Sequence, residues 1–270
     1  IQFTPDLMPS DITGHAVLDV SAAGSNASGL GALRIRRGPV FTHLLLADEI
    51  NRAPAKTQSA LLEVMQEYQV TFEGQTMLLP RPFMVLATQN PLETEGTYPL
   101  PEAQLDRFLF KLRVRYPQIE ELNAIIDRTT QARGATVDRV MTGAKVLAFR
   151  ELIREVPIAS HVRDLASTII MATHPQWERA PEATRRFVRY GASPRGAQAL
   201  VLGGKVRALA QGRYNVSAED LKTLAAPALR HRIILNFEGE AEAVDIDVLV
   251  GQIVEAAEAV TVQGKEAFLR

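Results

Sequence analysis

The feature that most constrains the fold is an apolar run that ends in two adjacent carboxylates. "HLLLADEINRAP", residues 43–54, carries three leucines and then Asp48 and Glu49. A second apolar run, "FMVLATQNP", ends in Gln89, Asn90 and Pro91. Nearly continuous apolar runs of this length are typical of strands buried on both faces of a parallel sheet. Because ligands of open parallel sheets bind outside the carboxyl ends of the strands, these polar residues are candidates for a site.

The first half of the chain alternates short apolar runs with helical periodicity, which predicts an α/β fold. We expect strands at residues 1–4, 42–47, 83–88 and 111–116, with the second and third in the centre of the sheet. "PAKTQSALLEVMQEY", residues 54–68, has apolar residues at helical spacing and Pro54 near its start. A parallel sheet covered by helices follows from this order.

Two insertions interrupt the α/β half, which we place at residues 1–135. Residues 15–41 hold two short alternating pieces joined by the Ser/Gly-rich "SAAGSNASGLG", which predicts an inserted hairpin or loop. "VTFEGQTMLL", residues 70–79, alternates on both sides of a Glu-Gly-Gln turn, which predicts a β-hairpin.

The second half of the chain is helical. We expect an all-helical subdomain at residues 145–238, followed at 239–270 by an acidic segment and a last amphipathic helix. Ser217 and Asp220 have the spacing of a helix start. Helices are predicted over residues 119–133, 145–155, 158–173, 193–211 and 217–231.

Composition excludes several classes of protein. Thirty basic and thirty-one acidic residues leave a net charge of −1, which does not favour nucleic acid or a membrane surface. The absence of cysteine excludes disulfides and thiolate metal sites, and the five scattered histidines do not have the spacing of a transition-metal site. The sequence contains neither an apolar run of about 18 residues nor a signal peptide. We therefore expect a cytoplasmic protein.

Two adjacent carboxylates after a buried strand can have two different roles, one in metal binding and one in water activation. Asp48 could hold Mg²⁺ through its water shell while Glu49 orients and activates water, as in nucleotide hydrolases. Both could equally be solvated loop residues that start the next helix. The amide of Asn90 could bond the attacking water and a terminal phosphate, or could only form a turn before Pro91.

Two arginines are further candidates. Arg107 precedes an apolar segment and could stabilise charge on a transferring phosphoryl group, often across a subunit boundary, or could form an ordinary surface ion pair. Arg195 lies in the first turn of a predicted helix, where a cation opposes the helix dipole. Contact with an anion would explain that position, although a plain surface arginine remains the alternative.

Four strings together resemble the MoxR family of AAA+ ATPases, from Ile1 to about Phe237. They are "IQFTPDLMPSDITG", "GPVFTHLLLADEINRAPAKTQSALLEVMQEYQVTFEG", "LATQNPLETEGTYPLPEAQLDRFLFKLRV" and "GASPRGAQAL". The resemblance implies a P-loop-type parallel core followed by a helical lid. It also implies that residues 15–41 are the helix-2 insertion and residues 70–79 the pre-sensor-1 hairpin of this clade.

The resemblance assigns roles to the candidate residues. Asp48 and Glu49 resemble the Walker B pair, Asn90 sensor 1, Arg107 the arginine finger and Arg195 sensor 2, with ATP and Mg²⁺ as cofactors. Family members form rings, usually hexameric, and act as chaperones for complex assembly or metal insertion in client proteins, often with von Willebrand factor A partners. A related motor on nucleic acid, a chelatase subunit and a non-hydrolysing scaffold remain alternatives.

The sequence departs from the family in one respect, because it contains no P-loop, G-x-x-x-x-G-K-(S/T). Gly204-Lys205 and Gly264-Lys265 come nearest, but each lacks the first glycine and the hydroxyl residue. In the family the P-loop comes just before the segment that resembles Ile1. We therefore expect that the N-terminal part is missing from this chain, and that the chain alone binds ATP poorly and is inactive.

Overall fold

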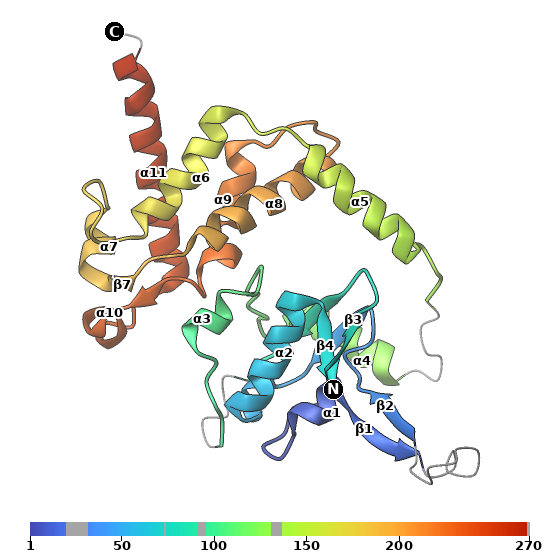
Figure 1. Ribbon diagram of the computed structural model, residues 1–270. Helices are drawn as coiled ribbons and strands as arrows, with labels where there is room; N and C mark the ends of the chain where they lie inside the picture. Colours follow the sequence, from blue (N-terminus) through green and yellow to red (C-terminus); the bar gives the residue numbers. More distant parts are fainter. Residues whose placement is uncertain (20–31, 73, 91–95, 131–136, 269–270) are drawn as a thin grey trace. The chain divides into compact units, whose positions relative to one another are not determined.

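The computed structural model describes residues 1–19, 32–72, 74–90, 96–130 and 137–268 (Figure 1). The chain divides into two compact units, Ile1–Arg107 and Phe108–Arg270. The sequence analysis placed the end of the first part later, at residue 135. The first unit contains α1 (Pro9–Thr13), β1 (Gly14–Asp19), β2 (Ala32–Arg37), β3 (Leu44–Ala47), a 3-10 turn (Ile50–Arg52), α2 (Ala55–Glu67), β4 (Gln69–Phe72), β5 (Gln75–Leu78), β6 (Met84–Ala87) and α3 (Glu102–Leu105).

The two long apolar runs form neighbouring parallel strands, as predicted. β3 pairs with β6 in register from Leu44↔Met84 to Ala47↔Ala87. Beyond β3, residues 1–4 run beside the chain in a short parallel bridge, in which the Phe3 amide donates to the carbonyl of Asp48 at 2.8 Å. The predicted strand over residues 1–4 is therefore reduced to this bridge.

The expectation that these strands are buried on both faces is wrong. Leu45 and Ala47 are buried, but Leu44 is 67% exposed and Leu46 is 51% exposed. On β6, Met84 is likewise 51% exposed. A continuous apolar run does not show which of its two faces is packed, because successive side chains of a strand point to opposite faces. Here the burial alternates along β3 although the residue type does not.

Both predicted hairpins are confirmed. β1 and β2 pair antiparallel, with the connecting residues 20–31 outside the described part of the chain. β4 and β5 pair antiparallel around Gly74, whose φ of +82° is accessible to glycine without strain.

The second unit is a helical bundle with a small hairpin. Its core contains Ile169, Leu200, Leu221 and Ile253, all fully buried. The helix α11 (Ile246–Phe268) packs against α6 (Ser160–Ala172) and α9 (Ala218–Leu229). The predicted helices are confirmed, except that residues 131–133, the end of the first, lie outside the described part of the chain, while α7, α10 and the β7–β8 pair were not predicted. The elements are α4 (Ile119–Thr130), α5 (Gly143–Glu155), α6 (Ser160–Ala172), α7 (Glu182–Phe187), β7 (Val188–Tyr190), α8 (Pro194–Ala210), α9 (Ala218–Leu229), β8 (Ile234–Leu235), α10 (Phe237–Ala241) and α11 (Ile246–Phe268).

The strand predicted at residues 111–116 is wrong. This segment has no regular secondary structure and no strand beside it among the described residues, and Val114 is 97% exposed. Its backbone is instead held by the end of α9, since the Lys111 amide donates to the carbonyl of Pro227 at 2.9 Å and Arg230 donates to the carbonyl of Lys111 at 2.9 Å. A strand needs a hydrogen-bonding neighbour, which an apolar pattern alone does not supply.

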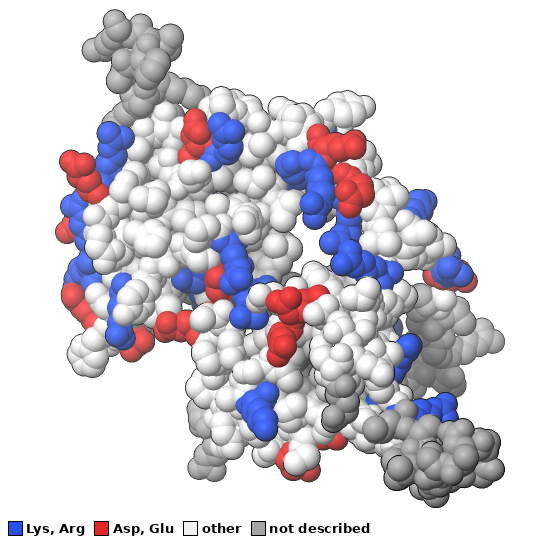
Figure 2. Space-filling view, in the orientation of Figure 1, with Lys and Arg blue, Asp and Glu red and all other residues white. Residues whose placement is uncertain are grey.

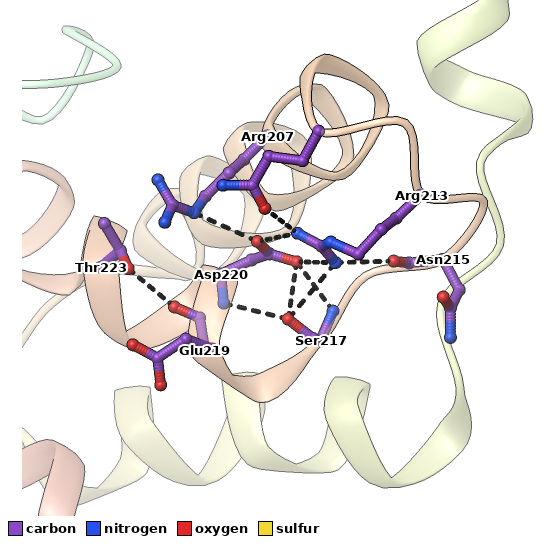
Figure 3. Close-up of polar contacts among 8 residues, drawn as sticks. Arg207, Arg213, Asn215, Ser217, Glu219, Asp220 and Thr223 are labelled. Atoms are coloured by element: carbon purple, nitrogen blue, oxygen red, sulfur yellow. Dashed lines mark hydrogen bonds and ion pairs between the residues drawn. The ribbon is translucent and has the colours of Figure 1, made fainter.

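The turn between α8 and α9 is fixed by one buried carboxylate (Figure 3). Asp220 is 1% exposed and accepts two hydrogen bonds from Arg213, at 2.5 and 2.9 Å, and one from the backbone of Ser217 at 2.9 Å. Arg207 of α8 lies 3.2 Å away. Burial by itself would raise the pKa of the Asp220 carboxyl, but the bonds from Arg213 and Ser217 outweigh it and lower the pKa to about 2.

Candidate functional site

The site lies at the carboxyl ends of β3 and β6. Asp48 directly follows β3 and Thr88 directly follows β6. The parallel ladder continues past both strands, because the Thr88 amide donates to the carbonyl of Ala47 and the Ile50 amide donates to the carbonyl of Thr88, each at 3.0 Å. The two strand ends are therefore held side by side.

Thr88 links both carboxylate residues. Its hydroxyl donates to Oδ1 of Asp48 at 2.5 Å and accepts from the backbone amide of Glu49 at 2.8 Å. The bond fixes one oxygen of Asp48 and orients the carboxylate. Sequence analysis missed Thr88, although its place directly after the second apolar run was the available signal.

Glu49 has an unusual backbone. Its φ of 53° and ψ of 49° are left-handed, a conformation that is uncommon and costly for a residue other than glycine. Its Oε2 accepts from Nε2 of Gln2 at 2.7 Å and forms an ion pair with Arg52 at 3.1 Å. Both contacts use Oε2, and the Glu49 side chain is 22% exposed.

A buried amide holds the turn that follows Glu49. Gln58 of α2 is fully buried, and its Nε2 donates to the carbonyls of Ile50, Ala53 and Tyr98 at 3.2, 3.0 and 2.9 Å. α2 thereby clamps the segment that sets the left-handed turn of Glu49. Nothing in the sequence distinguished this glutamine from a surface residue.

The other predicted residues are placed as follows. Asn90 follows β6, and its backbone carbonyl accepts from Nδ2 of Asn51 at 3.4 Å, so the loops after both strands are in contact. Arg107 is exposed after α3 and donates to the carbonyl of Leu62 at 3.4 Å. Arg195 lies in the first turn of α8, where its amide donates to the N-cap hydroxyl of Ser193 at 3.1 Å. Arg195 belongs to the second unit.

The donor set suits a magnesium ion rather than a tightly caged metal. Within the described ranges, no group of three or more His, Asp or Glu side chains could hold a metal ion. One carboxylate beside a hydroxyl is compatible with Mg²⁺, which keeps several waters and takes further oxygens from phosphates. The residues present therefore fit the predicted role of Asp48.

Two segments of the chain match models of protein families. Residues 1–110 match the model described as the ATPase family associated with various cellular activities (AAA). Residues 181–253 match the AAA lid domain. The parallel core and the helical lid thus define an AAA ATPase.

Comparison with individual proteins makes the family assignment more specific. The chain is 38% identical to Chaperone MoxR1 of Mycobacterium tuberculosis over 94% of its own length and 65% of that protein, and 39% identical to the uncharacterized protein YeaC of Bacillus subtilis over 95% and 75%. A solved structure of a candidate ATPase from Cytophaga hutchinsonii is 41% identical, with a TM-score of 0.85 over 95% of this chain and 76% of that one. The chain belongs to the MoxR family of AAA+ ATPases.

Proposed function

We propose that the chain is part of a MoxR-like ATPase that hydrolyses ATP at the Asp48–Glu49 edge. The observation that carries this proposal is the bond from Thr88 to Asp48, which joins the acidic pair after β3 to the end of the neighbouring parallel strand β6. Asp48 holds the water shell of Mg²⁺, and Glu49 orients and activates a water molecule. Mg²⁺, when bound with ATP, neutralises charge on the phosphates. Asn90 bonds the attacking water and the terminal phosphate.

Phosphate binding needs a further element, because a P-loop is not among these 270 residues. A P-loop supplies backbone amides and a lysine to the phosphates and a hydroxyl to the metal. The isolated 270-residue chain therefore binds ATP weakly and is inactive.

Assembly into a ring, hexameric as in the family, completes the site. Arg107 reaches the nucleotide of a neighbouring subunit, and Arg195 couples the lid to the nucleotide. Hydrolysis then drives chaperone-like remodelling of a client protein, assembly of a complex or insertion of a metal, with a von Willebrand factor A protein as a possible partner class. The name Chaperone MoxR1 of one relative supports the chaperone role.

A protein client is favoured over nucleic acid. Basic and acidic side chains are interspersed on the face drawn in Figure 2, in line with the net charge of −1, whereas nucleic-acid proteins gather their basic residues. A chelatase subunit and a non-hydrolysing scaffold are the other candidate functions. A measurement of ATP hydrolysis distinguishes the scaffold from the functions that depend on hydrolysis.

The test is steady-state ATP hydrolysis by the full-length protein with Glu49→Gln. This change keeps size and hydrogen bonding but removes the base, so turnover falls by on the order of 10²- to 10⁴-fold while ATP binding persists. Glu63→Gln, an exposed position on α2, is the matched control and keeps wild-type turnover. Normal turnover in Glu49→Gln would remove Glu49 from catalysis.

A further inference from the structure

A pocket lies at the opposite end of β3 from Asp48. It is an open pocket of about 480 Å³ at the amino end of the strand, beside the ends of β2 and β5. None of the residues discussed above for nucleotide chemistry lines it. The lining residues are Arg37, Phe41, Thr42, His43, Leu78, Leu79 and Pro80.

One wall of the pocket is apolar and firmly held. The ring of Phe41 stacks on Phe72, with centroids 6.3 Å apart and an interplanar angle of 28°. Leu79 is buried and supports the wall, whereas Leu78 is 74% exposed at its rim. An exposed leucine next to a fixed aromatic ring favours contact with an apolar side chain.

The rim of the pocket is basic. The Arg37 guanidinium, which lines the pocket, lies 5.4 Å from the centre of the Phe41 ring. Arg81 follows the lining residue Pro80 and lies 5.7 Å from the centre of the Tyr68 ring, outside the lining itself. Within the described residues, no carboxylate forms an ion pair with either arginine. The complementary ligand is therefore acidic.

The apolar wall indicates which class of acidic ligand fits the pocket. The Phe41 ring is already in contact with both Arg37 and Phe72, so it is not a free platform for stacking a base. Leucine and proline side chains beside an arginine instead suit a peptide that presents an apolar residue next to a carboxylate.

We propose that this pocket is a docking site for an acidic, apolar segment of a partner protein. The apolar side chain of that segment packs on Leu78 and Pro80, and its carboxylate receives hydrogen bonds from Arg37. The pocket lies roughly 13 Å, the length of the four-residue strand β3, from the nucleotide edge. Docking there leaves the Asp48–Glu49 edge open.

Fluorescence anisotropy on the full-length protein tests the proposal with labelled 12-residue peptides. The probe peptide alternates Glu with Leu and Phe, a second peptide has Gln for every Glu, and a third has Ser for every Leu and Phe. We expect only the first to bind, and expect Arg37→Gln and Leu78→Ser each to weaken its binding by about tenfold or more. Arg139→Gln, at an exposed position of the other unit, is the control and binds normally.

Three results would overturn the proposal. They are no binding of the first peptide, equal binding by the Arg37→Gln and Leu78→Ser proteins, and binding of a single-stranded oligonucleotide instead of the peptide with loss in Arg37→Gln. Both substituted positions are exposed, and circular dichroism verifies that each variant is folded.

Discussion

The hydroxyl of Thr88 donates a 2.5 Å hydrogen bond to the carboxylate of Asp48 across the β3–β6 pair. The same oxygen accepts from the amide of Glu49. One side chain therefore sets the position of both acidic residues, and its removal is expected to disturb the site without removing either carboxylate.

Thr88→Val tests this linkage. Valine keeps the shape of threonine but leaves Asp48 and the Glu49 amide without their shared partner, so ATP turnover should fall by about 10- to 100-fold, as for other residues that orient a metal ligand. Thr88→Ser retains the hydroxyl and should stay close to wild type. Equal turnover in all three proteins would show that Thr88 does not position the acidic pair.

The left-handed backbone of Glu49 predicts that glycine is more stabilising than alanine at this position, which is the reverse of their order inside a helix. Glu49→Ala and Glu49→Gly both lose the carboxylate, but only glycine adopts a φ of 53° without strain. In urea unfolding, the glycine variant should therefore be the more stable by about 1 kcal/mol. At exposed Glu63 in α2, the alanine variant should instead be more stable than the glycine variant by about 1 kcal/mol. If the alanine variant were more stable than the glycine variant at both positions, the backbone of Glu49 would not be strained.

Gln58→Met tests the clamp on the turn after Glu49. Methionine fills a similar volume but cannot donate to the three carbonyls that Gln58 holds, so the free energy of unfolding should fall by about 2 kcal/mol. Gln66→Met, at an exposed position on the same helix, should change it little. A loss at residue 58 no larger than that at residue 66 would argue against the clamp.

Asp220 predicts a pH dependence of stability in the lid. Its pKa is lowered from 3.8 to about 2 in the folded protein, so its stabilisation is fully present above pH 3.8 and is lost as pH falls toward 2. The shift corresponds to about 2 kcal/mol at neutral pH. The difference in unfolding free energy between wild type and Asp220→Asn should shrink between pH 5 and pH 3, whereas exposed Asp164→Asn should show little difference at either. A gap that stays constant with pH would count against this linkage.

Sequence alone was sufficient where a pattern has one structural outcome. The two apolar runs predicted the parallel pair, and Ser217 with Asp220 predicted the start of α9, whose capping box is present. Sequence-based prediction failed where the structure of a segment depends on hydrogen bonds to residues far away in the chain. Residues 111–116 have the pattern of a strand but are bonded to Pro227 and Arg230.

Only part of the site was predicted, because some of its contacts come from residues elsewhere in the chain. Two carboxylates directly after an apolar run are visible in a sequence, although solvated loop residues at the end of a strand give the same pattern. Thr88, Gln2 and Gln58 are not, since their residue types are common in loops and on helices, and only the fold brings them to Asp48 and Glu49. The roles of Asn90, Arg107 and Arg195 stay predictions.

The most direct test of the account mixes two inactive variants of the full-length protein. Arg107→Ala keeps an intact Asp48–Glu49 edge, while Glu49→Gln keeps the arginine, and each alone should lose on the order of a thousandfold in turnover. If Arg107 acts on a neighbouring subunit, mixed rings contain some complete sites, and combining the variants should partly restore ATP hydrolysis. If the mixture stays inactive although labelled subunits co-assemble, Arg107 serves its own chain, as its contact with Leu62 allows, and the shared site is wrong.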